Sequence, residues 1–329
     1  MKNKLAEIKN NKNKTIPILS FPSAQLMGIS VSQLLSSPES IVNGMLEIRE
    51  SCNVGASLNM MDLSVEAQCF GAKIRFYDNE VPAVEKGIIE DIGDVSDIKV
   101  PEIGLSRDVV FIESIRLAKK EITDMPVFAG VIGPFSLAGR LFDITEIMME
   151  CYSSPDEVKI LLEKASEFIT GYIKELKKAG ADGIIMAEPV AGLLSPALNN
   201  EFSIPYVEKI FSEINDDDFI ICYHNCGSAV TAQLREISTL SADIFHFGNA
   251  VDLKTALDII PSEKLIMGNI DPVLFLRGTP EEIEIKVQEL FDNFSSYDNF
   301  MISSGCDIPP SAKWENINAY FRKVEELYA

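Results

Sequence analysis

The sequence of 329 residues lacks any apolar run that approaches the roughly 20 residues needed to cross a bilayer. Its first residues, MKNKLAEIKNNKNK, carry positive charge, but no apolar stretch follows them. A secretory signal needs such a stretch directly after its charged start. We therefore expect a cytoplasmic protein in which residues 1–14 form a short polar lead-in, frayed or partly helical.

Basic residues are also scarce. The chain has 29 Lys and Arg against 50 Asp and Glu, which gives a formal net charge of -21. A polyanion of this kind repels nucleic acid and anionic membrane surfaces at long range. We expect neither of them as a partner, whereas a homodimer is compatible with the sequence.

The six cysteines show no tight disulfide spacing, since they stand at positions 52, 69, 151, 222, 226 and 306. In a reducing compartment such residues are thiols, metal ligands or core residues. Cys52, Cys69 and Cys151 lie in or beside segments of helical pattern and are interpreted as core or incidental.

No linker rich in Pro, Gly or Ser divides the chain, and no short repeat is present, so a single domain over residues 1–329 is expected. Short apolar runs alternate with longer amphipathic segments, which is typical of βαβ units. Eight runs are predicted as strands: Ile16–Phe21, Ala56–Met60, Pro126–Gly133, Asp182–Glu188, Phe219–Cys226, Ile244–Asn249, Lys264–Ile270 and Asn299–Cys306. Helices are predicted at Ser154–Ala179, Asp252–Ile260 and Thr279–Phe291.

Eight such strands favour an α/β fold of the (β/α)₈ barrel type, in which the chemistry sits at the carboxyl ends of the strands. Polar residues do gather at those ends: Glu188, His224, Cys226, His246, Asn249, Asn269, Asp271, Cys306 and Asp307. The alternative is an open doubly wound sheet. It would need a glycine-rich phosphate loop after the first strand, and FPSAQLMG is a poor one.

His224 and Cys226 are two residues apart at a strand end, so their side chains point to the same face. Cys306 ends the last predicted strand, across the barrel mouth. One imidazole and two thiolates suit zinc, and three protein ligands leave a position open, as in catalytic sites. H-x-C alone is a short pattern that also occurs in buried cores. The placement at two strand ends favours the metal interpretation, with Cys222 packed one layer deeper.

Four segments carry a resemblance to a known family: GVIGPFSLAG (130–139), AGADGIIMAEPVAGLLSP (179–196), ICYHNCGS (221–228) and SSGCDIPPSAKWENI (303–317). They resemble the uroporphyrinogen decarboxylase superfamily, and within it the zinc-dependent methylcobamide:coenzyme M methyltransferases. The resemblance implies a TIM barrel, with His224, Cys226 and Cys306 as zinc ligands. It also implies transfer of a methyl group from methylcobalamin or another corrinoid, carried by a corrinoid protein, to a small thiol.

We expect coenzyme M as the methyl acceptor, and the alternatives are another thiol or tetrahydrofolate. Two further functions remain open: a tetrapyrrole decarboxylase, and a corrinoid-protein-binding module without catalysis. The decarboxylases carry an arginine-rich motif near the amino terminus, whereas Phe21 to Gln25 offers no cationic group here.

Glu188 and His246 are the candidate catalytic residues. Glu188 could accept the thiol proton or bind a corrinoid-side group, or it could be a helix N-terminal anion or the partner of a buried cation. In the resembling methyltransferases a glutamate from the sixth strand end can occupy the open zinc position. His246 stands in that region here, as a fourth ligand, a donor behind the ligands or a satisfied barrel-mouth histidine.

Asn249, Asn269 and Asp271 are candidates for binding the cofactor or the acceptor's polar tail. Asp271-Pro272 is also an ordinary turn opening. Asp307 follows a predicted ligand and could orient it.

Overall fold

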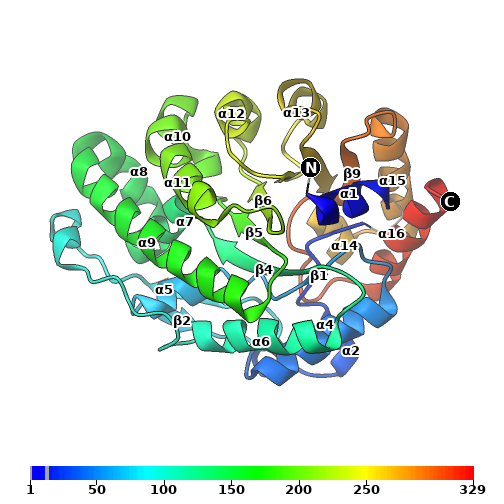
Figure 1. Cartoon of the computed structure of the whole chain (residues 1–329), viewed down its shortest axis with the longest axis horizontal. Helices are drawn as coiled ribbons and strands as arrows, with labels where there is room; N and C mark the ends of the chain where they lie inside the picture. The colour runs from blue at the N-terminus through cyan, green and yellow to red at the C-terminus, as the bar shows by residue number, and fades with distance from the viewer. Residues whose placement is uncertain (1, 12–14) are drawn as a thin grey trace.

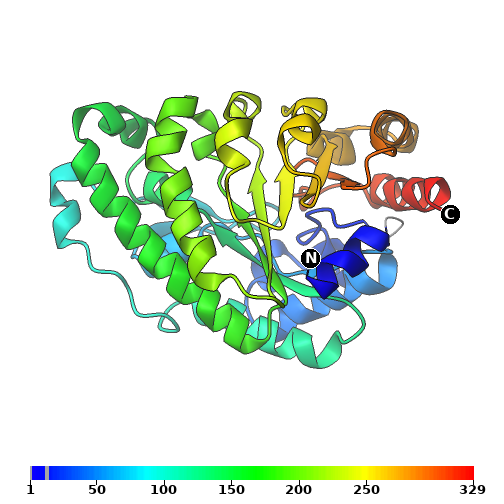
Figure 2. The ribbon, with the colours of Figure 1, turned by 45° about the horizontal axis from the view of Figure 1, so that its top comes forward.

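The computed structural model describes residues 2–11 and 15–329. Seven parallel strands form one curved sheet in the order β1-β4-β5-β6-β7-β8-β9, and β2 pairs antiparallel with β3. Helices surround the sheet (Figure 1). In Figure 2 the strands near residues 220–250, drawn yellow-green to yellow, run side by side beneath this helical cover. The predicted barrel fold is confirmed.

The strands are β1 (Ser57–Leu58), β2 (Lys73–Arg75), β3 (Ala83–Lys86), β4 (Val127–Ile132), β5 (Gly183–Ala187), β6 (Ile220–Asn225), β7 (Ile244–Phe247), β8 (Leu265–Ile270) and β9 (Phe300–Ser304). The helices are α1 (Asn3–Asn10), α2 (Ser23–Met27), α3 (Val31–Leu34), α4 (Pro38–Ser51), α5 (Val65–Cys69), α6 (Asp108–Glu121), α7 (Pro134–Leu141), α8 (Ile144–Ser153), α9 (Pro155–Ala179), α10 (Pro196–Phe202), α11 (Ile204–Ile214), α12 (Val230–Ile237), α13 (Leu253–Ile259), α14 (Pro272–Arg277), α15 (Pro280–Phe294) and α16 (Trp314–Leu327). Short 3₁₀ turns cover Ile92–Asp97 and Ala191–Leu193.

The predicted strands from Ala56–Met60 onward are confirmed, and so are the three predicted helices, as α9, α13 and α15. Local sequence signals explain the helix boundaries. Proline occupies the first turn of α9 and α15, where no N–H is required. The longest of them, α9, stops at Gly180, which has a φ of 112°.

The first predicted strand, Ile16–Phe21, is wrong as a regular strand. Pro17 lacks the N–H that a ladder needs. The chain here forms one parallel bridge with the segment before β1. Its contacts with β9 are hydrogen bonds that involve hydroxyl groups, in place of a backbone ladder. These contacts are the Thr15–Val54 bridge, Thr15 Oγ1 to Ile302 O, Ser303 Oγ to Ile16 O at 2.9 Å, and Ile18 N to Ser304 Oγ at 3.0 Å. The segment therefore still lies between the two edge strands of the sheet.

Alternating side chains divide the core into two layers. Along β6, Ile220 and Cys222 belong to a cluster inside the barrel. Ile221 and Tyr223 belong to the larger cluster between sheet and helices. Both faces of the sheet are thus buried, which explains the nearly continuous apolar strands.

The amino-terminal end of the barrel is closed by α1, drawn dark blue in Figure 1. Leu5 and Ile8 are 2% and 4% exposed and join the inner cluster. Two lysines of the same segment bind residues just before the strands. Lys4 pairs with Asp182 before β5. Lys2 donates to Phe219 O before β6 and pairs with Asp243 before β7. Residues 3–10 are thus helical, which agrees with the partly helical alternative for the lead-in, and residues 1 and 12–14 lie outside the described ones.

None of the helices built from residues 2–11 and 15–329 has the length and apolar character that a membrane crossing requires.

Ile8→Ala should lower the free energy of unfolding by about 2–5 kcal/mol, because it removes buried methyl groups from the barrel interior. Urea denaturation measures this loss. The adjacent Glu7 is exposed, so Glu7→Ala should stay within about 0.5 kcal/mol of the wild type. Equal stability of the two variants would show that α1 does not seal the barrel.

Candidate metal centre

The period of two in β6 places His224 and Cys226. Ile220 and Cys222 face the barrel interior, and His224 and Cys226 continue the same row toward the carboxyl end of the strand. His224 is 2% exposed, while Cys226 is half-buried just beyond the strand. The strand therefore carries its polar groups at the barrel mouth and its apolar groups in the packed interior.

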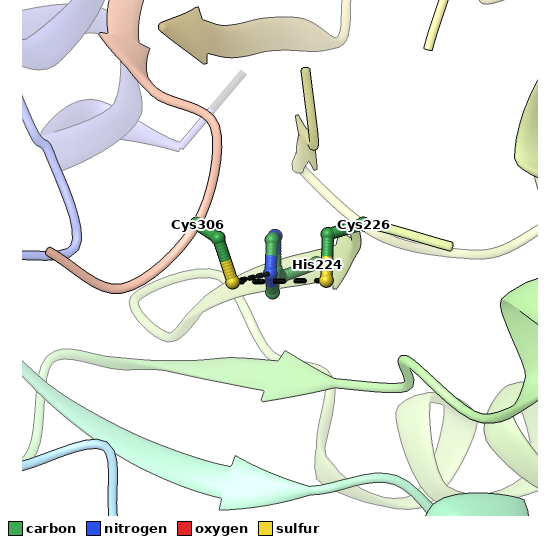
Figure 3. A group of neighbouring side chains, drawn as sticks. All are labelled: His224, Cys226 and Cys306. Carbon is green, nitrogen blue, oxygen red and sulfur yellow. Dashed lines mark hydrogen bonds between the residues drawn. The ribbon is translucent and has the colours of Figure 1, made fainter. Parts of the chain in front are cut away.

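Cys306 reaches the same point from the loop after β9, and Figure 3 shows the three side chains converging. Cys306 Sγ lies 3.5 Å from His224 Nε2 and 3.6 Å from Cys226 Sγ. All three ligand atoms lie within 4.8 Å of one another. The structure thus brings together the three residues that the sequence predicts as metal ligands.

The donor set fits zinc. Zinc bonds of about 2.0–2.3 Å at tetrahedral angles place ligand atoms roughly 3.5–3.8 Å apart. Both distances from Cys306 match this spacing. One nitrogen and two sulfurs are donors that zinc prefers, and they leave one tetrahedral position for another ligand.

A hydrogen bond joins the two thiols. Cys306 Sγ donates a hydrogen bond to Cys226 Sγ. This bond lowers the pKa of Cys226 and raises that of Cys306 to about 12. Cys226 is therefore the easier of the two to ionise, and a metal that binds both must displace the proton of Cys306.

His246 stands behind His224, on the side away from the thiols. Its Nδ1 lies 2.7 Å from His224 Nδ1, and its Nε2 lies 2.9 Å from Ser303 Oγ. Burial, reinforced by His224, holds the pKa of His246 well below its usual value, so the ring is neutral. Both ring nitrogens are thus engaged away from Cys226 and Cys306, which fits an orienting group better than a fourth ligand.

The hydrogen-bond partners assign the tautomers of both histidines. The Ser303 hydroxyl donates to Ile16 O at 2.9 Å and must therefore accept from His246 Nε2–H. His246 Nδ1 is then the acceptor for His224 Nδ1–H. This leaves the lone pair of His224 Nε2 facing Cys306, which is the form that binds a metal.

A cavity of about 210 Å³ opens beside the three predicted ligands. The loop between β2 and β3 supplies Val81 and Pro82 to its wall, so this hairpin, which the sequence did not predict, helps to form the site. The polar side chains on the wall, besides the three ligands, are Asp62, Arg140 and Asp307. Burial raises the pKa of Asp307 well above its usual value.

Glu188 is fully buried, and its carboxylate lies at the start of α7. It accepts hydrogen bonds from Phe135 N at 2.7 Å and from Ser136 N at 3.1 Å. A Cβ on Gly133 would lie 2.1 Å from Glu188 Oε2, so the Gly-Pro-Phe turn needs glycine there. These contacts match the helix N-terminal anion considered from the sequence. A catalytic role for Glu188 stays a prediction.

The remaining candidates make local contacts in the structure. Asn269 Nδ2 donates to Gly248 O at 3.0 Å and to Val251 O at 2.9 Å. Asp271 caps α14 by accepting from Val273 N at 2.8 Å. Asn249 is exposed. Among the described residues that line the cavity, none of these three appears, and their binding roles stay predictions.

The family model described as uroporphyrinogen decarboxylase (URO-D) matches residues 15–327. The chain belongs to the URO-D family. It is 29% identical over 273 residues to methylcobamide:CoM methyltransferase MtbA of Methanosarcina acetivorans, covering 78% of this chain and 76% of that protein. It is also 23% identical over 290 residues to uroporphyrinogen decarboxylase of Pseudoalteromonas translucida, covering 83% of this chain and 79% of that protein.

Solved structures agree with the fold. A methyltransferase from Methanosarcina mazei superimposes with a TM-score of 0.88 at 23% identity, over 99% of this chain and 98% of that one. A B12-independent methionine synthase from Shewanella sp. W3-18-1 gives a TM-score of 0.62 at 17% identity, over 96% of each chain. At these identities the likeness establishes the shared barrel.

Sequence reasoning missed three polar residues at this site: Asp62, Ser303 and Arg140. Ser303 is buried in β9 and holds His246, and its only signal was its place on the inner face, three residues before Cys306. Arg140 follows directly after the segment GVIGPFSLAG, which carries the family resemblance. It lies in the last turn of α7, and the chain folds it onto the cavity wall.

The purified protein should contain about one zinc per chain, and Cys226→Ala and Cys306→Ala should lose it, because each removes one of three converging donors. Cys222→Ala is the matched control, since Cys222 lies one layer deeper on the same strand face. Elemental analysis measures the metal. Far-UV circular dichroism should change little on chelation, because the barrel buries its own core. Metal retained in both ligand variants, or unfolding on chelation, would contradict this.

Glu188→Gln should change how stability depends on pH. Burial raises the pKa of Glu188 from 4.5 to about 7. The folded state thus binds this proton more tightly, so the contribution is fully present below about pH 4.5 and is lost as pH rises through 7. The stability difference between wild type and variant should fall over that range, by up to about 3 kcal/mol. Urea denaturation at several pH values measures this difference. The pKa of Glu66 is raised similarly, but its contribution to stability is the same in both proteins and cancels. Parallel curves would contradict a buried charge.

Proposed function

We propose that this chain transfers a methyl group from a methylated corrinoid, carried by a partner protein, to a small thiol, with coenzyme M as the leading acceptor. The observation that carries the proposal is the convergence of His224, Cys226 and Cys306 on one cavity, at separations that suit zinc. The names of relatives support it, because two are methylcobamide:CoM methyltransferases at 28–29% identity.

Zinc, when bound, stabilises an incoming thiol as its thiolate, which is a far better nucleophile at neutral pH. The thiolates of Cys226 and Cys306 donate electron density and keep the acceptor sulfur electron-rich. His246 holds the His224 ring in place through Nδ1. The cavity wall then aligns the acceptor for in-line displacement.

In this displacement one bond forms and one bond breaks. The sulfur lone pair forms the S–CH₃ bond while the Co–C bond breaks, and its electron pair stays on cobalt. The thiol proton leaves to solvent. The chain supplies positioning and activation, and the corrinoid supplies the methyl group.

Decarboxylation of a tetrapyrrole is the competing function, because several relatives are named uroporphyrinogen decarboxylase at 23–26% identity. Such a substrate carries many carboxylates. On the described part of the cavity wall, one arginine stands beside two carboxyl-bearing residues, Asp62 and Asp307. This charge pattern favours a substrate with few anionic groups.

Addition of an acceptor thiol to the zinc-loaded protein should raise the number of sulfurs around the metal from two to three, with release of about one proton. The reason is that the metal binds thiolate in preference to thiol. Zinc X-ray absorption and proton release in weak buffer measure the two effects. The matched methylcobalamin demethylation assay should proceed with the thiol and fail in Cys306→Ala.

An unchanged zinc shell together with methyl transfer to tetrahydrofolate would show that the thiol assignment is wrong. Decarboxylation of uroporphyrinogen by the wild type, without demethylation of methylcobalamin, would select the competing function.

A further inference from the structure

Arg140 is a half-buried cation on the wall of the candidate site, and no ion pair joins it to another described residue. It lies in the last turn of α7 and lines the same cavity as His224, Cys226 and Cys306. In the described part of the chain its Nε is buried without a hydrogen-bond partner. Burial also lowers the pKa of Arg140, which expresses the missing solvation of its charge. An unpaired guanidinium in such a place is suited to bind an anion that enters the cavity.

The nearby carboxylates do not pair with Arg140. Asp62 is the acid that acts most strongly on the charge of Arg140. It is already bound by Arg107 through an ion pair and by Ser64 through a hydrogen bond of 2.6 Å. Glu66 accepts a hydrogen bond from Ile132 N at 3.0 Å instead. Of the two arginines near Asp62, Arg107 pairs with it, whereas Nε of Arg140 has no hydrogen-bond partner among the described residues.

We infer that Arg140 determines acceptor specificity at this site, because it binds an anionic group of the methyl acceptor and so selects anionic thiols over neutral thiols of similar size. The inference rests on the proposed function for its thiol end. The sulfur would lie at the three ligands and the anionic group at Arg140, both within one cavity of about 210 Å³. A guanidinium binds either anion through paired hydrogen bonds, so both sources share the same recognition chemistry.

The test compares thiols of similar size and different charge on the zinc-loaded protein. 2-Mercaptoethanesulfonate and 3-mercaptopropionate should bind about 10- to 100-fold more tightly than neutral 2-mercaptoethanol, as charge-assisted hydrogen bonds imply. Cationic cysteamine should bind least well. Isothermal titration calorimetry gives the dissociation constants, and demethylation assays give the acceptor KM. Because Asp307 lies on the same wall, a preference for cysteamine would overturn the inference.

Arg140→Met should abolish the preference for anionic thiols, raising their KM with little change in kcat, while the affinity for 2-mercaptoethanol stays the same. Arg140→Lys should restore part of the preference. Arg116→Met is the matched control, because Arg116 is exposed on α6 and pairs with Glu113. Zinc content and circular dichroism should match the wild type in every variant. Equal discrimination by wild type and Arg140→Met would overturn the inference.

Ethanesulfonate separates this inference from the proposed function, because it has the anion but no thiol. It should bind the wild-type protein weakly and Arg140→Met at least about 10-fold more weakly. If no thiol accepts a methyl group yet ethanesulfonate still depends on Arg140, the proposed acceptor fails and the anion site stands. If thiols accept the methyl group without regard to charge, the anion site fails and the proposed function stands.

Discussion

The alternation of side chains along β6 is the constraint on which the site depends. A strand that buries Ile220 and Cys222 inside the barrel must present His224 and Cys226 on the same face further along. A slip of one residue would turn both ligands toward the helices and expose the apolar row. Packing of the interior therefore fixes the direction of the ligands, and the parallel register with β7 sets His246 directly opposite His224.

The two ends of the barrel differ in the side chains that fill them: apolar at the amino-terminal end and polar at the carboxyl end. At the amino-terminal end, α1 inserts Leu5 and Ile8 and anchors itself by lysines on Asp182 and Asp243. At the carboxyl end, the inner row becomes polar at His224, His246 and Ser303. The cavity beside His224, Cys226 and Cys306 opens at this second end, where the chemistry of this fold class sits.

Most of the fold and the convergence of His224, Cys226 and Cys306 could be predicted from the sequence, because both rest on strand periodicity and on the meeting of strand ends in a barrel. Apolar runs identified the strands, and the i, i+2 spacing of His224 and Cys226 survives folding unchanged. Other features depend on contacts between distant segments. In the first segment Pro17 cannot donate to a ladder, and hydroxyl groups of β9 make the contacts instead. Leu5 and Ile8 stand in a mostly polar stretch, and their burial depends on docking against the barrel interior. The hydrogen bonds from His224 through His246 to Ser303 join the strands β6, β7 and β9, and no spacing in the sequence predicts them.

Charge explains why a single arginine matters at this site. A chain with a net charge of -21 repels small anions at long range, so an anionic acceptor gains nothing from the overall field. With zinc bound, the thiolates of Cys226 and Cys306 would neutralise its charge, and a third thiolate would make the centre negative. Under the proposed function, selection of an anionic thiol would therefore have to come from a cation inside the cavity, where the low dielectric strengthens the contact and salt screens it little. Arg140 is placed there, and the pairing of Asp62 with Arg107 leaves its guanidinium available.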